Sequence, residues 1–146
     1  MIIVSSIRHH SSAPEETLAL GERLAAGLSS GAVVLLVGPL GAGKTVLAKG
    51  IARGLGIRED IVSPTYTIVS EYRAARAHLY HVDLYRIEGE SQIENLGLED
   101  MLGNEAIAIV EWGEKLDSWL EGRRTRITLG LAPDGGRDIL IQELGE

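Results

Sequence analysis

The sequence contains no cysteine and carries more acidic than basic residues. Without cysteine the chain can form neither a disulfide nor a thiolate metal site, which is compatible with a reducing cytoplasm. Lys and Arg number 14 against 21 Asp and Glu, which gives a formal net charge of −7. This balance argues against a protein that wraps nucleic acid by charge alone, although contact with RNA through a partner stays open.

Long hydrophobic runs and targeting features are missing as well. The longest apolar run, residues 32–37, is far too short to span a bilayer. Residues 1–7 are apolar but lack the basic start, the long apolar stretch and the small-residue cleavage site of a signal peptide. The sequence also has no internal repeat, low-complexity segment or linker. We therefore expect a cytoplasmic protein that does not contact a membrane.

The chain does have the length and apolar content of one packed domain. It has 146 residues, of which 45% are hydrophobic and 24% charged, so we expect one domain over residues 1–146. The hydrophobic pattern predicts strands at 1–7, 32–37, 78–83 and 106–110, a strand that begins within 63–70, and a hairpin of 126–131 and 137–142 around 133–136. The predicted helices are one that starts at a Ser12 cap with Pro14 in its first turn, one over 44–55, one over 92–102 interrupted at Gly97, and a short one over 115–120.

The clearest chemistry lies in a glycine-rich turn between the apolar strand 32–37 and the helix 44–55. This turn, Gly38-Pro39-Leu40-Gly41-Ala42-Gly43-Lys44-Thr45, fits the pattern G-x-x-x-x-G-K-[ST]. Glycines let successive backbone N–H groups surround a phosphate, and the following helix aims its N-terminal dipole at the same anion. Lys44 supplies a charge for the outer phosphates, and the Thr45 hydroxyl is placed to bind Mg²⁺. The flanking strand and helix argue against a chance glycine turn.

A phosphate-binding loop of this kind needs an acidic group on the metal side, usually at the end of a nearby strand. Asp83 ends the strand 78–83, and Glu111 follows the strand 106–110. We expect at least one of them to hold the metal or its water, and either could orient the attacking water. The alternative for each is a charged residue that marks where a strand meets solvent. His81 could form a metal pair with Asp83, but a hydrogen-bonding neighbour is the simpler interpretation.

Two further features bear on the nucleotide. A hydroxyl that senses the γ-phosphate could lie in the turn Ser63-Pro64-Thr65-Tyr66-Thr67, which could equally be a plain turn before a strand. A guanine-reading Asn-Lys-x-Asp motif is incomplete, because Glu114 replaces its Asn, and no Asp-x-x-Gly follows a strand. This pattern favours ATP. Residues 9–14 are a candidate segment over the base, and Trp112 is either core or a lid over the nucleotide.

Four blocks occur in one order, and together they resemble a known family. The blocks are Gly38 to Thr45, Ser63-Pro64-Thr65-Tyr66-Thr67, His81-Val82-Asp83-Leu84-Tyr85-Arg86 and Glu111-Trp112. Over 38–112 the chain resembles the TsaE (YjeE-type) family, and the remainder agrees in length and element order. The resemblance implies a small ATPase that assists formation of threonylcarbamoyladenosine in tRNA. It implies work with the TsaD and TsaB proteins, contact with tRNA through that complex, and hydrolysis that resets the complex between turnovers.

The resemblance also implies roles for individual residues. These are Lys44 and Thr45 for phosphates and Mg²⁺, Val46 for a backbone N–H, Thr65 for the switch hydroxyl, Asp83 and Glu111 for the metal-side and water-side carboxylates, and Trp112 beside the nucleotide. For Thr65, the resemblance favours the switch over the plain turn. The predicted catalytic set is therefore Lys44, Thr65, Asp83 and Glu111.

The predicted fold is a single three-layer α/β P-loop domain with a largely parallel sheet and antiparallel C-terminal strands. Hydrolysis should be slow without partners, because the sequence offers no obvious arginine finger. Two other functions compete with this one. A small-molecule kinase would use the same loop and take its lid arginines from Arg73, Arg76 and Arg86. In a nucleotide-gated binding module, ATP occupancy would govern docking and hydrolysis would matter little.

Overall fold

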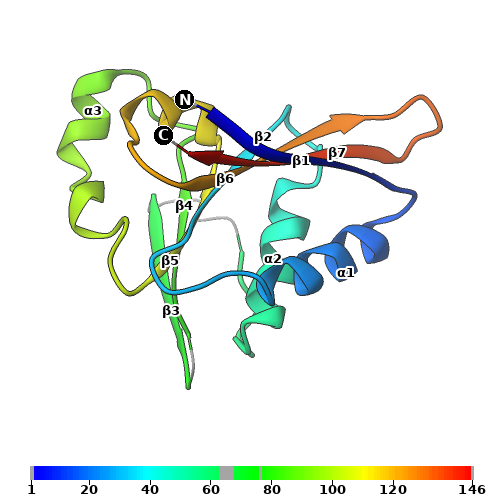
Figure 1. Ribbon diagram of the computed structural model, residues 1–146, viewed down its shortest axis with the longest axis horizontal. Helices are drawn as coiled ribbons and strands as arrows, with labels where there is room; N and C mark the ends of the chain where they lie inside the picture. The colour runs from blue at the N-terminus through cyan, green and yellow to red at the C-terminus, as the bar shows by residue number, and fades with distance from the viewer. Residues whose placement is uncertain (1, 63–67, 76, 146) are drawn as a thin grey trace.

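The structure, a computed structural model, describes residues 2–62, 68–75 and 77–145. The described residues form a seven-stranded mixed sheet with the order β1-β7-β6-β2-β5-β4-β3 (Figure 1). Its strands are β1 (Ile2–Ser11), β2 (Val33–Val37), β3 (Val69–Ala74), β4 (Ala77–Asp83), β5 (Ile107–Glu111), β6 (Arg124–Leu131) and β7 (Arg137–Gly145). The two chain ends lie close together because Ile2 pairs with Gly145.

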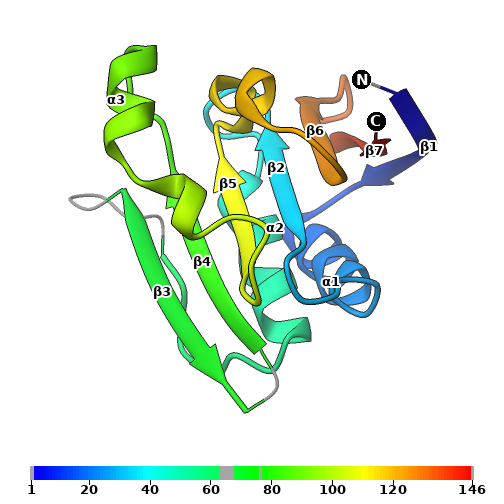
Figure 2. The ribbon, with the colours of Figure 1, turned by 60° about the vertical axis from the view of Figure 1, so that its left-hand side comes forward.

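The centre of the sheet is parallel and its margins are antiparallel. The neighbouring strands β6, β2, β5 and β4 run parallel to one another. Strand β3 pairs antiparallel with β4, β7 with β6, and β1 with β7; Figure 2 shows β3, β4, β5 and β2 side by side. The predicted α/β fold and the C-terminal hairpin are confirmed. Strands near β1 and β3 were predicted, but the antiparallel pairing of β1 with β7 and of β3 with β4 was not.

Strand β2 is buried on both faces. Val34 and Leu36 pack into one hydrophobic cluster, whereas Val33 and Leu35 pack into a second cluster on the other side. Successive side chains of a strand point to opposite faces, so an apolar run without alternation needs cover on both sides. The run at 32–37 therefore predicted a central parallel strand correctly.

Helices α1 (Pro14–Ala25) and α2 (Lys44–Gly54) lie side by side and cover one face of the sheet (Figure 1). Two glycines allow their close approach. A Cβ on Gly50 would lie 2.2 Å from the Leu18 carbonyl oxygen, and a Cβ on Gly21 would lie 2.7 Å from the Leu47 carbonyl oxygen. Neither distance is possible for a real side chain, so α1 holds α2 against the strands only because both positions are glycine.

Short helices cover the other face. The predicted helix 92–102 is present as α3 (Glu90–Asn95) and the 3₁₀ turn η1 (Leu98–Asp100). The break lies at Gly97 as predicted, where φ is +67°. The predicted helix 115–120 is wrong. Two 3₁₀ turns, η2 (Gly113–Lys115) and η3 (Asp117–Trp119), replace it and bury Leu116 between them. None of the described helices is long and apolar enough to cross a membrane.

The start of α1 differs from the prediction by one residue. The N-cap is Ala13 rather than Ser12, and Pro14 occupies the first turn as expected. The Ser12 backbone N–H instead donates to Glu16 Oε2 at 2.9 Å, and the Ser11 hydroxyl donates to the Ala13 carbonyl at 2.9 Å. The predicted serine cap was wrong, because the cap residue is Ala13 and no side chain caps the first turn.

Parallel strands place the candidate site at their carboxyl ends. The glycine loop, residues 38–43, follows β2, Asp83 ends β4 and Glu111 ends β5. The register pairs Glu111 with Leu36 on one side and with Asp83 on the other. Ligand sites in open α/β sheets lie at this edge. The predicted loop and both predicted acids therefore meet at one place.

Candidate functional site

The glycine loop connects β2 to α2 in a conformation that favours glycine. Gly41 and Gly43 have φ values of +80° and +101°, and Gly43 is the N-cap of α2. Gly38 passes so close to β6 that a Cβ there would lie 2.3 Å from the Leu129 carbonyl oxygen. The loop thus brings bare backbone to the amino end of a helix, which is the arrangement that binds anions.

Lys44 holds its ammonium group against the loop itself. Its Nζ donates to the carbonyl of Gly38 and, at 3.0 Å, to the carbonyl of Pro39. The residue is only 5% exposed, and burial lowers the pKa of Lys44 while Glu111, Glu114 and Asp83 oppose that shift. The carboxylates around it favour a charged lysine at the mouth of the loop, where it can donate to an anion.

Trp112 packs against the second hydrophobic cluster and also lies beside this ammonium group. Its ring centre is 3.8 Å from Lys44 Nζ, and its ring is 5.1 Å from that of Tyr85. Trp112 has φ +60°, the only positive φ outside glycine among the described residues. This conformation costs a non-glycine residue about 1–2 kcal/mol. Trp112 therefore contacts both the core and the glycine loop, and its role as a lid over the nucleotide stays a prediction.

Glu111 is the central acid of the site. It is 3% exposed; its Oε1 accepts a hydrogen bond from the Thr45 hydroxyl at 2.9 Å, and its Oε2 lies 2.6 Å from His81 Nε2. Asp83 is only partly buried, and its Oδ1 accepts the Tyr85 backbone N–H at 2.9 Å. Glu111 is therefore buried between two directed partners, whereas Asp83 is only partly buried.

The oxygens of Thr45 and Glu111 fit a magnesium site. Two adjacent ligands of an octahedral Mg²⁺ with bonds of 2.0–2.1 Å lie about 2.9 Å apart. Thr45 Oγ1 and Glu111 Oε1 have this separation, 2.9 Å. No cluster of three or more His, Cys, Asp or Glu side chains that could hold a metal occurs among the described residues. A site of one hydroxyl and one or two carboxylates suits Mg²⁺, which takes its remaining ligands from water and substrate phosphates.

Lys115 ties together the turns that carry the two acids. Its Nζ donates to the carbonyls of Leu84, Tyr85 and Ile87 at 3.0, 2.9 and 2.9 Å. Asp117 accepts from Arg124 at 2.6 Å and from Arg126 at 2.8 Å. Lys115 and Asp117, the two residues that remain of the incomplete guanine-reading motif, are therefore engaged in structural contacts.

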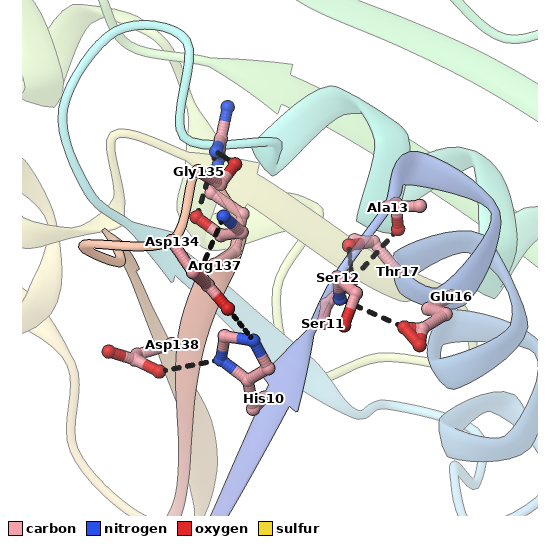
Figure 3. Close-up of polar contacts among 11 residues, drawn as sticks. His10, Ser11, Ser12, Ala13, Glu16, Thr17, Asp134, Gly135, Arg137 and Asp138 are labelled. Atoms are coloured by element: carbon pink, nitrogen blue, oxygen red, sulfur yellow. Dashed lines mark hydrogen bonds and ion pairs between the residues drawn. The ribbon is translucent and has the colours of Figure 1, made fainter.

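A cavity of about 170 Å³ lies beside the glycine loop. Its lining comes from the start of α1, from the loop and α2, and from the β6–β7 turn, and includes Ser12, Gly41, Val46 and Arg137. Arg137 donates to the Gly41 carbonyl at 3.1 Å, so the hairpin is tied to the loop. Figure 3 shows this end of the hairpin, with His10 turned toward Asp134 and Asp138. Of the candidate segment 9–14, residues 11–14 line the cavity, whereas His10 contacts the hairpin acids.

The structure brings most of the predicted site residues together and adds others. The loop residues 38–45 with Val46, the two acids and Trp112 meet at the strand ends. Thr65 lies outside the described residues, as do the rest of the predicted switch turn and Arg76. Arg137 was not predicted, because no motif marks it, and Lys115 was considered only within the incomplete guanine-reading motif. His81 was considered only beside Asp83, whereas the structure pairs it with Glu111 on the adjacent strand.

The fold and these residues define a class of protein. It is a mixed α/β domain with a mostly parallel sheet, in which a glycine loop of the phosphate-binding sequence pattern joins a buried strand to a helix. The family model for the threonylcarbamoyl adenosine biosynthesis protein TsaE matches residues 11–139. The chain therefore belongs to the TsaE family, and the resemblance drawn from the sequence blocks is confirmed.

Individual relatives agree with this assignment. The tRNA threonylcarbamoyladenosine biosynthesis protein TsaE of Bacillus subtilis is 42% identical over 132 residues, which cover 90% of this chain and 82% of that protein. The protein of the same name from Treponema pallidum is 40% identical, covering 78% of this chain and 84% of its own length. The crystal structure of Bacillus subtilis YdiB superposes with a TM-score of 0.81 at 32% identity, covering 99% of this chain and 89% of that one.

Proposed function

We propose that this protein is a Mg²⁺-dependent ATPase that assists threonylcarbamoyladenosine modification of tRNA together with TsaD and TsaB. Membership in the TsaE family supports the role in tRNA modification. The single observation that carries the ATPase is the contact between Thr45, on the first turn behind the glycine loop, and Glu111. It joins a hydroxyl of the phosphate-binding pattern to a buried carboxylate, which is the pairing that Mg²⁺-nucleotide chemistry needs.

In this proposal the glycine loop and Lys44 bind the phosphates of ATP. The backbone N–H groups of the loop and of the start of α2 donate to the β- and γ-phosphate oxygens. Lys44 exchanges its carbonyl contacts with Gly38 and Pro39 for phosphate oxygens, and the indole of Trp112 keeps water from one side of the ammonium group. Such loops lower the activation barrier because their donors are already in place to stabilise the negative charge that develops on the phosphate oxygens.

The residues that would hold Mg²⁺ are Thr45 and Glu111, with Asp83 beside them. When bound with ATP, Mg²⁺ offsets the negative charge that develops on the phosphate oxygens. Asp83 is paired in register with Glu111 but is less buried, so it is better placed to orient the attacking water. Glu111, which is held by two partners, is the better ligand.

The cavity beside the loop suits the nucleoside half of ATP. Its polar wall includes the serines that precede α1, and Arg137 closes the side toward the β6–β7 turn. Thr65 remains the predicted switch hydroxyl. We further propose that TsaD and TsaB complete the site, that tRNA is met through that complex in the cytoplasm, and that hydrolysis resets the complex between turnovers.

The decisive experiment is Mg²⁺-ATP hydrolysis by the purified protein, alone and with TsaB, TsaD and tRNA. We expect slow turnover alone and stimulation by the partners, with both lost in Lys44→Ala. Fast turnover without partners would contradict the proposed completion of the site. Bound ATP without stimulation would contradict the modification ATPase, and full partner activity in a Glu111→Gln variant that still binds ATP would instead support a nucleotide-gated module.

One of the arginines that the kinase alternative would use lies away from the glycine loop. Arg73 is paired in register with His78 near the amino end of β4, whereas the glycine loop faces the carboxyl end at Asp83. Arg73 also contacts Glu71 at 3.7 Å. Phosphate transfer from ATP to a metabolite rather than to water would support this alternative.

A further inference from the structure

Three side chains form a hydrogen-bonded row that leads from the interior of the sheet to the glycine loop. His81 on β4 is 0% exposed, and its Nε2 lies 2.6 Å from Glu111 Oε2. The other oxygen of Glu111 accepts the Thr45 hydroxyl at 2.9 Å. Each carboxylate oxygen of Glu111 therefore has its own partner, one in the core and one at the loop.

The short contact fixes which ring nitrogen of His81 serves Glu111. A separation of 2.6 Å between Nε2 and a carboxylate oxygen requires a proton between them. Among the described residues, buried Nδ1 has no hydrogen-bond partner. The contact with Glu111 is therefore the one hydrogen bond that the described residues give this ring.

We propose that His81 is a positioning residue that orients Glu111, an inference that rests on the proposed ATPase function. A glutamate side chain has three rotatable bonds, and its carboxylate can present either oxygen to a ligand. The hydrogen bond from His81 holds Oε2 in the core, so that Oε1 alone faces Thr45 and the nucleotide. His81 is fully buried and so does not reach the reacting phosphate; it acts through Glu111. Such outer partners of ligating carboxylates set metal affinity and activity.

The test compares His81→Gln with His81→Leu. The glutamine amide can donate from nearly the position of Nε2, whereas leucine fills similar space without a donor. We expect His81→Leu to lower kcat about 10- to 100-fold and to raise the Mg²⁺ concentration for half-maximal activity, with the KM for ATP changed less than about threefold. We expect His81→Gln to restore most of the loss. His78→Gln is the matched control, because His78 lies on the same strand but contacts Glu71 outside the site.

A second readout does not depend on hydrolysis. Nitrogen NMR of the histidine rings reports which nitrogen carries the proton, and the signals absent from His81→Gln identify His81. We expect Nε2 to carry a proton in the wild type.

An Nε2 without a proton would overturn the proposal even if the ATPase is confirmed. Equal defects in His81→Gln and His81→Leu at matched thermal stability would reduce His81 to a packing role, and unchanged kinetics in both would exclude any role. If wild-type protein with partners hydrolyses no ATP, the proposed function fails. Mg²⁺-dependent ATP binding, measured through Trp112 fluorescence in a Trp119→Phe background, then decides the role of His81: equal Mg²⁺ midpoints in wild type and His81→Leu would overturn it.

Discussion

His81 and His10 both contact carboxylates, yet they lie in opposite surroundings. His81 is buried in the parallel part of the sheet and meets one oxygen of Glu111 at 2.6 Å. His10 lies near the end of β1, exposed, and bridges Asp134 at 2.9 Å and Asp138 at 3.0 Å (Figure 3). The same pair of chemical groups thus occurs once in the core beside the glycine loop and once on the antiparallel margin.

The two histidine–carboxylate pairs differ in their exposure to water, which sets how strongly each contact orients its side chains. At the margin, solvent screens the charges and lets the side chains move, so the contact adds little and responds to pH and salt. In the core, no solvent competes for the carboxylate, so a single hydrogen bond decides its orientation. Burial, rather than residue type, therefore distinguishes a histidine that orients a reacting group from one that fastens a surface turn.

Loss of the Lys44 ammonium group at the glycine loop should have the largest effect. We expect Lys44→Ala to weaken ATP binding at least about 100-fold, because it removes the charge that the loop carbonyls and Trp112 hold at the phosphate position. Trp112 emission in a Trp119→Phe background measures the affinity. Lys49→Ala is the control, since Lys49 lies on the same helix but contacts Asp60 at 3.8 Å. An equal loss in Lys49→Ala would show that net charge, rather than the loop, binds ATP.

The two carboxylate partners provide the next test. We expect Glu111→Gln to lower ATP hydrolysis about 100-fold while ATP affinity changes only a few-fold, because a neutral amide cannot accept from His81 and Thr45 at once. Asp138→Asn makes the same chemical change beside His10 and should leave hydrolysis unchanged. Hydrolysis and binding are measured on the same preparations. Comparable loss in Asp138→Asn would remove the distinction between the buried and the exposed pair.

Much of the buried region could be predicted from the sequence because its chemistry is local. A strand, a glycine turn and a helix follow one another directly, so the loop and Lys44 could be assigned from residue order alone. The ends of strands share one edge in a parallel sheet, which brought Asp83 and Glu111 to the loop without knowledge of the strand order. The hairpin is local as well, so it could be predicted from the alternation of its two strands and from its Pro-Asp-Gly-Gly turn.

The remainder depends on contacts between segments far apart in the sequence. Gly50 is ordinary in a helix until α1 lies against it, and Lys115 has no motif that marks the three carbonyls it contacts. His81 was considered with Asp83, its neighbour in sequence, but strand pairing gave it Glu111 instead. The partner of β1 was equally hidden, since edge strands are paired by packing rather than by local pattern. Thr65 is outside the described residues, so its switch role stays a prediction.

A smaller effect should follow from removing the hydrogen bonds that Lys115 donates to the turn after β4. We expect Lys115→Met to lower the free energy of unfolding by about 1–3 kcal/mol, because three backbone carbonyls between Leu84 and Ile87 lose a charged donor. Urea unfolding at constant slope measures the change. Lys49→Met, which removes a lysine from an exposed contact, should change the free energy by less than about 0.5 kcal/mol. Equal losses would mean that Lys115 stabilises only as a surface charge.

The smallest effect concerns His10, and its sign follows from the direction of its pKa. The hydrogen bond to Asp138, with Asp134 nearby, raises the pKa of His10 above its ordinary value of 6.5 despite some desolvation. A group with a raised folded pKa stabilises fully below its unfolded pKa, and this stabilisation is lost as the pH rises through the folded pKa. The backbone N–H of Gly136 is the main cause that lowers the pKa of Asp134, so this carboxylate stays ionised throughout that range.

Thermal unfolding of wild type and His10→Gln across this pH range therefore tests the exposed contact of His10 with Asp134 and Asp138. We expect the wild type to have the higher Tm at about pH 5.5 and the difference to close by about pH 8.5. Because the pair is exposed, about 1 M salt should close it even at low pH. A difference that persists unchanged at high pH or high salt would mean that His10 acts through packing, as a buried histidine does. The contrast between the two histidines would then not be one of solvent.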